Sequence, residues 1–119
     1  MPHLTIEYSA NLPHYPEAET LTALNATLCS HPQVQDEADL KTRFIVADSF
    51  EIGIAPANRA FVHAQLRRLS GRTPEAKKEL SDRIAAVLRE RTPKPQGVMV
   101  QLSVEIVDMD RGSYVKERL

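Results

Sequence analysis

A repeated pattern of strand, helix and strand is the feature of this sequence that most constrains its fold. The tripeptide Pro-Glu-Ala at residues 16–18 recurs at residues 74–76. We interpret this as two fused βαβ units, with pseudo-repeats at about residues 2–52 and 60–110. A coincidence is the alternative, because any two βαβ units share periodicity and turn residues. The common offset also aligns apolar positions: Leu4 with Val62, Phe44 with Leu102, and Val46 with Val104.

Four segments carry the patterns of β-strands. Between Val98 and Val107 every second residue is apolar, which predicts that one face of this strand packs on the core. The segment from Leu4 to Tyr8 alternates in the same way. The expected strands are residues 4–8, 44–50, 61–69 and 98–107.

Two amphipathic helices are predicted between these strands. The first begins at Pro16-Glu17, and the second has Thr73 as its cap and Pro74 in its first turn. A strand, a helix and a strand at this spacing indicate a parallel pair with a crossover helix. The expected apolar stripes are Leu21, Leu24 and Leu28 in the first helix, and Leu80, Ile84, Val87 and Leu88 in the second.

The predicted architecture is a single α+β domain, residues 1–119, with one mixed four-stranded sheet and both helices on one face. The other face is then uncovered, and a bare sheet exposing Phe, Val and Ile would be a sticky surface. We therefore expect a homo-oligomer. The tail from Met109 to Leu119 contains Tyr114 and Val115 among charged residues, and either contacts a neighbouring subunit or frays.

The composition excludes several classes of protein. The 119 residues suffice for one domain, and 15 Lys and Arg against 16 Asp and Glu lack the basic excess that nucleic-acid binding requires. Cys29 is the single cysteine, which excludes an internal disulfide and fits a reducing compartment. With no pattern of a secretion signal or a membrane span, we expect a cytoplasmic protein with neither membrane nor nucleic acid as a partner.

Short motifs in a fixed order identify a family resemblance. The motifs are Pro2-His3-x-x-x-Glu7-x-Ser9-x-Asn11, Arg43, Phe61-Val62-His63 and Gly71-Arg72-Thr73. From Pro2 to about Val107 the sequence resembles the 5-carboxymethyl-2-hydroxymuconate isomerases of the tautomerase superfamily. The resemblance implies a trimer of tandem βαβ subunits with the sheets inside. It also implies a cofactor-independent keto-enol or double-bond shift in an unsaturated polycarboxylate during the degradation of aromatic acids.

Within this resemblance Pro2 is the catalytic base, provided that Met1 is removed. A proline inside a chain has an amide nitrogen without a usable lone pair, whereas a proline at the terminus is a secondary amine. Ordinary α-amino groups titrate near ~7.7–8.0, so a base active at neutral pH needs a lower pKa. A decrease of about two units corresponds to about 2.7 kcal/mol, which burial and nearby guanidinium groups can supply.

The resemblance assigns Arg43 and Arg72 to the carboxylates of the substrate, because a guanidinium binds a carboxylate at two points and stays charged. Lys41 is a departure, since related sequences tend to carry an arginine there, and it bears on substrate specificity. Phe50 and His63 are further candidates for the pocket lining. The alternatives are a surface role for each arginine and an interface role for His63.

Other chemistries find no support in the sequence. The four histidines and Cys29 lack the paired spacing of metal ligands, and we expect no metal and no cofactor. The run Arg67-Arg68 with Arg72 is too small for nucleic acid and is typical of carboxylate recognition or of solvated charge. Two further hypotheses stay open: another tautomerase-superfamily reaction on a small unsaturated acid, and a non-catalytic trimeric binding protein of the same fold.

Overall fold

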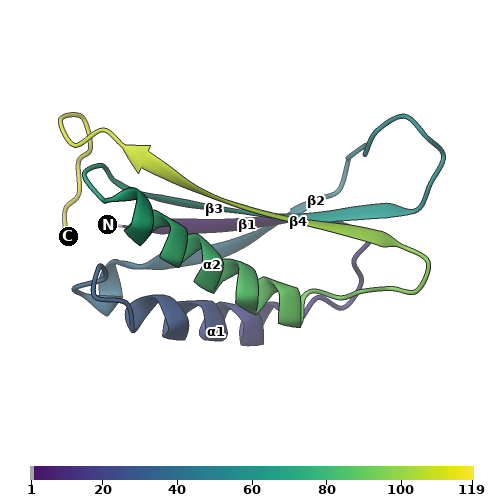
Figure 1. Cartoon of the computed structure of the whole chain (residues 1–119), viewed down its shortest axis with the longest axis horizontal. Helices are drawn as coiled ribbons and strands as arrows, with labels where there is room; N and C mark the ends of the chain where they lie inside the picture. Colours follow the sequence, from purple (N-terminus) through teal and green to yellow (C-terminus); the bar gives the residue numbers. More distant parts are fainter. Residues whose placement is uncertain (1) are drawn as a thin grey trace.

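The computed structural model describes residues 2–119, so Met1, whose removal the sequence analysis expects, lies outside the described residues. The elements in chain order are β1 (His3–Ser9), α1 (Glu17–Cys29), the 3-10 helix η1 (Glu37–Asp39), β2 (Lys41–Ala47), β3 (Arg59–Leu69), α2 (Pro74–Arg91) and β4 (Met99–Met109). The strand order is β2-β1-β3-β4. β1 and β2 are parallel, as are β3 and β4, while the central pair of β1 and β3 is antiparallel. Both helices cover the same face of the sheet (Figure 1), which confirms the predicted tandem βαβ fold class.

The core lies between the sheet and the two helices. Alternate residues of β1 and β3 point toward the helices because side chains along a strand alternate between its two faces. The side chains that fill this layer are Leu4, Ile6, Val62, Ala64 and Leu66 from the sheet, and Leu24, Leu28, Leu80, Ile84 and Leu88 from the helices. The apolar side of β4 packs against the same cluster.

The start of each helix is stabilised in a different way. In α2, Thr73 Oγ1 accepts a hydrogen bond from the Ala76 N–H at 3.1 Å, and Pro74 occupies the first turn, as predicted. α1 begins after Pro16 without a side-chain cap. Its first residue, Glu17, instead accepts a hydrogen bond from the Tyr8 hydroxyl, which fastens the helix to β1.

The predicted bounds of the second strand were wrong. Residues 41–47 form β2, whereas the sequence favoured residues 44–50. β2 pairs in parallel with β1, and its seven residues match the seven residues of that partner. The partner strand, and not the apolar content, therefore sets its ends. Arg43 consequently lies inside the strand, and Phe50 lies beyond it.

A single offset does not relate the two βαβ units throughout. Thr20, Leu24 and Leu28 are the buried residues of α1, while Leu80, Ile84 and Leu88 are those of α2. These sets differ by two residues more than the Pro-Glu-Ala offset, and the β3–β4 register is displaced by two residues as well. Side chains along a strand alternate with a period of two, so a shift by two residues leaves each side chain on the same face of the sheet. The boundaries of the pseudo-repeats stay a prediction.

The sheet face turned away from the helices is mainly polar, which corrects the expectation of an apolar bare face. His63 on this face makes two polar contacts: its Nδ1 lies 2.7 Å from Ser103 Oγ, and its Nε2 lies 2.7 Å from Glu105 Oε2. Alternation places the apolar residues of β2 and β4 mostly toward the helices. The composition of this sheet face therefore gives no support to the expected oligomer.

The C-terminal tail packs on its own chain. Tyr114 Oη lies 2.9 Å from His3 Nε2. Lys116 donates a hydrogen bond to the Asp39 carboxylate, and Arg118 Nη2 donates one to Asp36 Oδ2 at 2.7 Å. The Lys116 ammonium is the main cause that lowers the pKa of Asp39. The tail is thus bound over η1 of its own chain.

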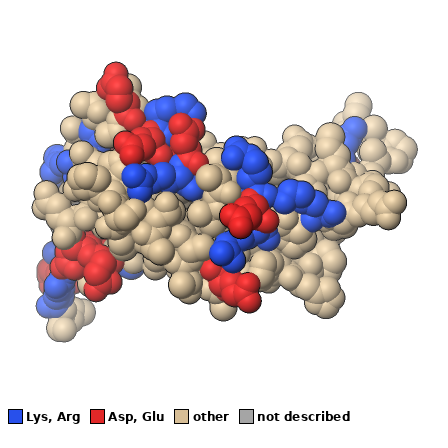
Figure 2. Space-filling model, turned by 60° about the horizontal axis from the view of Figure 1, so that its bottom comes forward, with Lys and Arg blue, Asp and Glu red and all other residues tan. Residues whose placement is uncertain are grey.

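The face of the molecule in Figure 2 carries charges of both signs. On the face shown in Figure 2, Lys and Arg side chains lie interspersed with Asp and Glu, without a continuous basic stripe in that view. The described residues contain no helix that combines the length and the apolar character needed to cross a bilayer.

The Tyr8 hydroxyl gives the first testable prediction. Burial, followed by the hydrogen bond to Glu17, raises the pKa of Tyr8 from 10.0 to about 12. The folded state therefore holds this proton more tightly than the unfolded state. The resulting stability is fully present below pH 10 and is lost as the pH rises toward about 12. Burial also raises the pKa of Tyr15, so ultraviolet titration of tyrosinate is expected to show late ionisation from both residues. Tyr8→Phe should reduce the amplitude of this late ionisation, whereas Tyr114→Phe should leave it unchanged; an unchanged late amplitude in Tyr8→Phe contradicts the assignment.

Candidate active site

Pro2 is buried and lines a cavity of about 140 Å³ at the end of the molecule that carries both termini (Figure 1). Its carbonyl oxygen accepts a hydrogen bond from the Lys41 N–H at 3.1 Å, which extends the β1–β2 ladder by one residue and fixes the start of the chain. The side chains that matter for the chemistry of this cavity are Gln33, Asp36, Arg68, Arg72 and Arg111.

Arg72 reaches the cavity from the turn between β3 and α2. The turn depends on Gly71, whose φ of +108° is a conformation that residues with a side chain rarely adopt. Arg111 Nε donates a hydrogen bond to the Ser70 carbonyl oxygen at 2.7 Å and supports the same turn. The Nε of Arg72 is buried and has no hydrogen-bond partner among residues 2–119. One donor of this guanidinium is therefore available to a ligand.

Arg68 is the most deeply buried cation of the cavity. It continues the core-facing side of β3 and is only 3% exposed. Its Nη2 donates a hydrogen bond to the Gln33 carbonyl oxygen at 3.2 Å, while Nε and Nη1 are buried and unpartnered within the described chain. Burial, and then the charge of Arg72, lowers the pKa of Arg68, whereas Asp108 acts in the opposite direction. An anion in this cavity would relieve both the repulsion and the missing hydrogen bonds.

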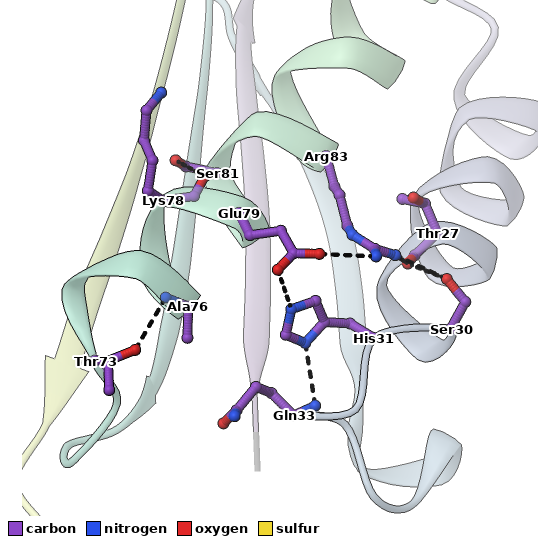
Figure 3. A network of polar contacts seen from close by, with 10 residues as sticks. All are labelled: Thr27, Ser30, His31, Gln33, Thr73, Ala76, Lys78, Glu79, Ser81 and Arg83. Atoms are coloured by element: carbon purple, nitrogen blue, oxygen red, sulfur yellow. Dashed lines mark hydrogen bonds and ion pairs between the residues drawn. The ribbon is translucent and has the colours of Figure 1, made fainter.

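A polar network fastens the segment that carries Gln33 (Figure 3). The buried His31 accepts a hydrogen bond at Nδ1 from the Gln33 N–H at 3.1 Å, and its Nε2 lies 3.2 Å from Glu79 Oε2. Arg83 Nη2 donates a hydrogen bond to Glu79 Oε1 at 3.0 Å, and its Nη1 donates one to a carbonyl oxygen in the last turn of α1. Because these contacts join the end of α1 to α2, the Gln33 carbonyl is held where Arg68 binds it.

Two carboxylates at the cavity are balanced by the tail. Asp36 and Asp39 line the cavity beside Pro2. Arg118 is the main cause that lowers the pKa of Asp36, and Lys116 has the same effect on Asp39. The cations of the tail therefore offset these acids, so the electrostatic character of the cavity is set by its arginines.

The structure brings two of the predicted site residues together, Pro2 and Arg72. Arg43 projects from the opposite face of the sheet, where its Nη2 lies 3.4 Å from His3 Nδ1. Lys41 lies near η1, and its Nζ donates a hydrogen bond to the Asp39 carbonyl oxygen at 2.5 Å. Neither Arg43 nor Lys41 is among the residues that line the Pro2 cavity.

Phe50 and His63 lie outside this cavity as well. Phe50 is 37% exposed in the loop between β2 and β3, at the far end of the sheet in Figure 1, with its ring centroid 6.2 Å from that of Phe61. His63 lies on the polar sheet face, bound to Ser103 and Glu105. In one copy of the chain, these two side chains are separate from Pro2.

From the sequence, Arg68 was named only within the run Arg67-Arg68, with carboxylate recognition and solvated charge as the two interpretations, and Gln33 was not named at all. A signal for Arg68 was present, because residue 68 continues the buried alternation of Ala60, Val62, Ala64 and Leu66, where a charge is costly. No comparable signal exists for Gln33, which lies in a loop placed by the contacts of His31. Within residues 2–119 no cluster of His, Cys, Asp and Glu suits a metal ion.

Comparison with known proteins adds independent evidence. The sequence model of the family described as 5-carboxymethyl-2-hydroxymuconate isomerase matches residues 2–118. A crystal structure of a 5-carboxymethyl-2-hydroxymuconate isomerase from Deinococcus radiodurans R1 is 29% identical, with a TM-score of 0.87 over 99% of this chain and 90% of that chain. A structure of 5-carboxymethyl-2-hydroxymuconate delta-isomerase is 19% identical, with a TM-score of 0.82 over 100% of this chain and 88% of that one.

More distant structures share the fold. A fused 4-OT described as a symmetric trimer is 18% identical, with a TM-score of 0.67 over 98% of this chain and 94% of that chain. A search of curated proteins gives no match. Since the family model covers nearly the whole sequence, the chain belongs to the 5-carboxymethyl-2-hydroxymuconate isomerase family and is an enzyme of the isomerase class.

Proposed function

We propose that this protein is a cofactor-independent isomerase of 5-carboxymethyl-2-hydroxymuconate or a similar unsaturated polycarboxylate, with the amine of Pro2 as general base. The observation that carries the proposal is the cavity itself: a buried Pro2 shares it with two guanidinium groups whose N–H donors include some without a partner in the described part of the chain. Such donors suit the carboxylates of the substrate, and their charge favours the neutral form of the amine.

The reaction needs one proton and no redox partner. The amine of Pro2 takes a proton from the dienol, and the electron pair moves along the conjugated system as a dienolate. The resulting ammonium returns the proton to a carbon further along the chain, so the product has the same atoms as the substrate. A guanidinium near the developing negative charge, with Arg72 as the candidate, lowers the energy of the dienolate.

We also propose a cytoplasmic homotrimer. The symmetric trimer formed by a structural neighbour supports this assembly, and the single cysteine fits a reducing compartment. Arg43, Lys41, Phe50 and His63 remain candidates for substrate binding. Because they lie outside the Pro2 cavity of their own protomer, we propose that any contact with substrate is made across a subunit boundary.

A direct assay tests the function. Purified protein, shown by intact mass to begin at Pro2, is expected to isomerise 5-carboxymethyl-2-hydroxymuconate without added cofactor and equally well in the presence of a chelator. A panel of other small unsaturated acids, including halogenated ones, tests the alternative that Lys41 has changed the specificity. Binding of these acids without turnover of any of them would favour the hypothesis of a non-catalytic binding protein.

A further inference from the structure

The cavity contains more cationic donors than the fold uses. With residues 2–119 considered, Arg68 has two unpartnered nitrogen atoms, Nε and Nη1, and Arg72 has a third in Nε, all of them buried. Arg68 contributes one hydrogen bond to the protein, to the Gln33 carbonyl oxygen. A buried guanidinium normally binds a carboxylate or several acceptors, because unpaired donors in a dry environment are costly.

We propose that Arg68 is a specificity-determining residue which, together with Arg72, holds one carboxylate of the substrate beside Pro2. This inference rests on the proposed function, in that the Pro2 cavity is taken as the reaction site. A carboxylate has two oxygen atoms with about four acceptor positions, so a single group can accept from all three unpartnered donors. Its negative charge also offsets the repulsion between the two guanidinium groups.

Packing gives no reason for an arginine at this position. The preceding residues on the same side of β3 are apolar, and a methionine has a similar length without a charge to desolvate. Buried charges can often be replaced by apolar residues of similar volume with no loss of stability. The arginine therefore carries a cost in the empty protein that a bound anion removes.

The location restricts the ligand. The cavity measures about 140 Å³, which is enough for one carboxylate and the atoms next to it but not for a whole polycarboxylate. The remainder of the substrate must extend out of the cavity. Arg68 then selects acids in which a carboxylate lies within a few bonds of the atoms that exchange a proton with Pro2, and disfavours the corresponding esters and amides.

The test measures binding independently of turnover. The probe is cis,cis-muconate, a stable unsaturated dicarboxylate, titrated into the full-length protein by calorimetry. Arg68→Met is expected to raise the Kd for muconate by about tenfold, as for the loss of a charge-assisted hydrogen bond. Arg68→Lys keeps the charge but not the planar fork of donors, so its Kd should lie between those of the wild type and Arg68→Met. Arg89→Met, which removes an exposed cation of α2, is the matched control and should bind like the wild type.

Two further readouts separate a binding role from a structural one. In the absence of ligand, Arg68→Met should melt at the same temperature as the wild type or higher, and with substrate it should raise KM more than it lowers kcat. An unchanged Kd for muconate in Arg68→Met overturns the proposal. If that variant does not fold, an unchanged Kd in Arg68→Lys overturns it equally. Muconate binding that depends on Arg68 in a protein without isomerase activity would refute the proposed reaction but retain this site, whereas turnover with an Arg68-independent Kd would do the reverse.

Discussion

Replacement of Pro2 by alanine is expected to lower kcat by about a hundredfold, at the lower end of the range for general acid-base catalysis, with little change in KM. Alanine still permits removal of Met1 and still leaves a primary amine, so part of the base function persists. The cavity and its cations are unaffected, which preserves substrate binding. Retention of Met1 is expected to lower kcat further than Pro2→Ala does, because the nitrogen of residue 2 is then an amide and cannot accept a proton.

Steady-state kinetics on preparations checked by intact mass provide the measurement. Pro13→Ala is the matched control, since Pro13 lies exposed in the loop between β1 and α1. In the wild type, kcat/KM should rise with pH through a pKa below that of an ordinary α-amino group, as expected for an amine near arginines. If Pro2→Ala retained full kcat, the terminal amine could not be the base.

The second large effect is expected for Arg72→Ala, with a loss of about a hundredfold in kcat/KM, equivalent to about 2.7 kcal/mol and typical of lost charge-assisted hydrogen bonds. Here both parameters should change. KM rises because a substrate carboxylate loses a partner, and kcat falls because the dienolate loses a nearby positive charge. Arg72→Lys should recover part of kcat but less of KM, since lysine keeps the charge without the planar fork.

The same assays, with Arg89→Ala as the control for a lost cation on the neighbouring helix, measure these effects. A change in KM alone would assign Arg72 to binding and leave stabilisation of the dienolate to another group. Equal and negligible effects in Arg72→Ala and Pro2→Ala would remove the candidate site altogether.

Much of the fold could be predicted because strands and helices differ in periodicity. The alternation between residues 98 and 107 and the Thr73 cap both correspond to observed features. The ends of β2 were predicted less well, since the length of β1 limits the ladder. The polar character of the outer sheet face was also missed, because it depends on which side of each strand the helices cover.

The candidate site was predictable only where a motif or a strand register marked it. Pro2 and Arg72 belong to local motifs, and the structure places both at one cavity. The sequence left Arg68 between carboxylate recognition and solvated charge, and its position on the buried side of β3 is the signal that favours the first. Gln33 depends on tertiary contacts that leave no local pattern. The predicted roles of Arg43, Lys41, Phe50 and His63 stay predictions, because none of these residues lines the Pro2 cavity.

The tail fastened over η1 has a practical consequence for handling this enzyme. Lys116 and Arg118 are close to the last residue of the sequence, yet their partners are carboxylates of the Pro2 cavity. Trimming the final four residues, or fusing an affinity tag that pulls them away, would deprive Asp36 and Asp39 of these cations. A polyanionic substrate would then meet more negative charge beside Pro2, so tags belong neither at this terminus nor on Pro2, but in an exposed loop.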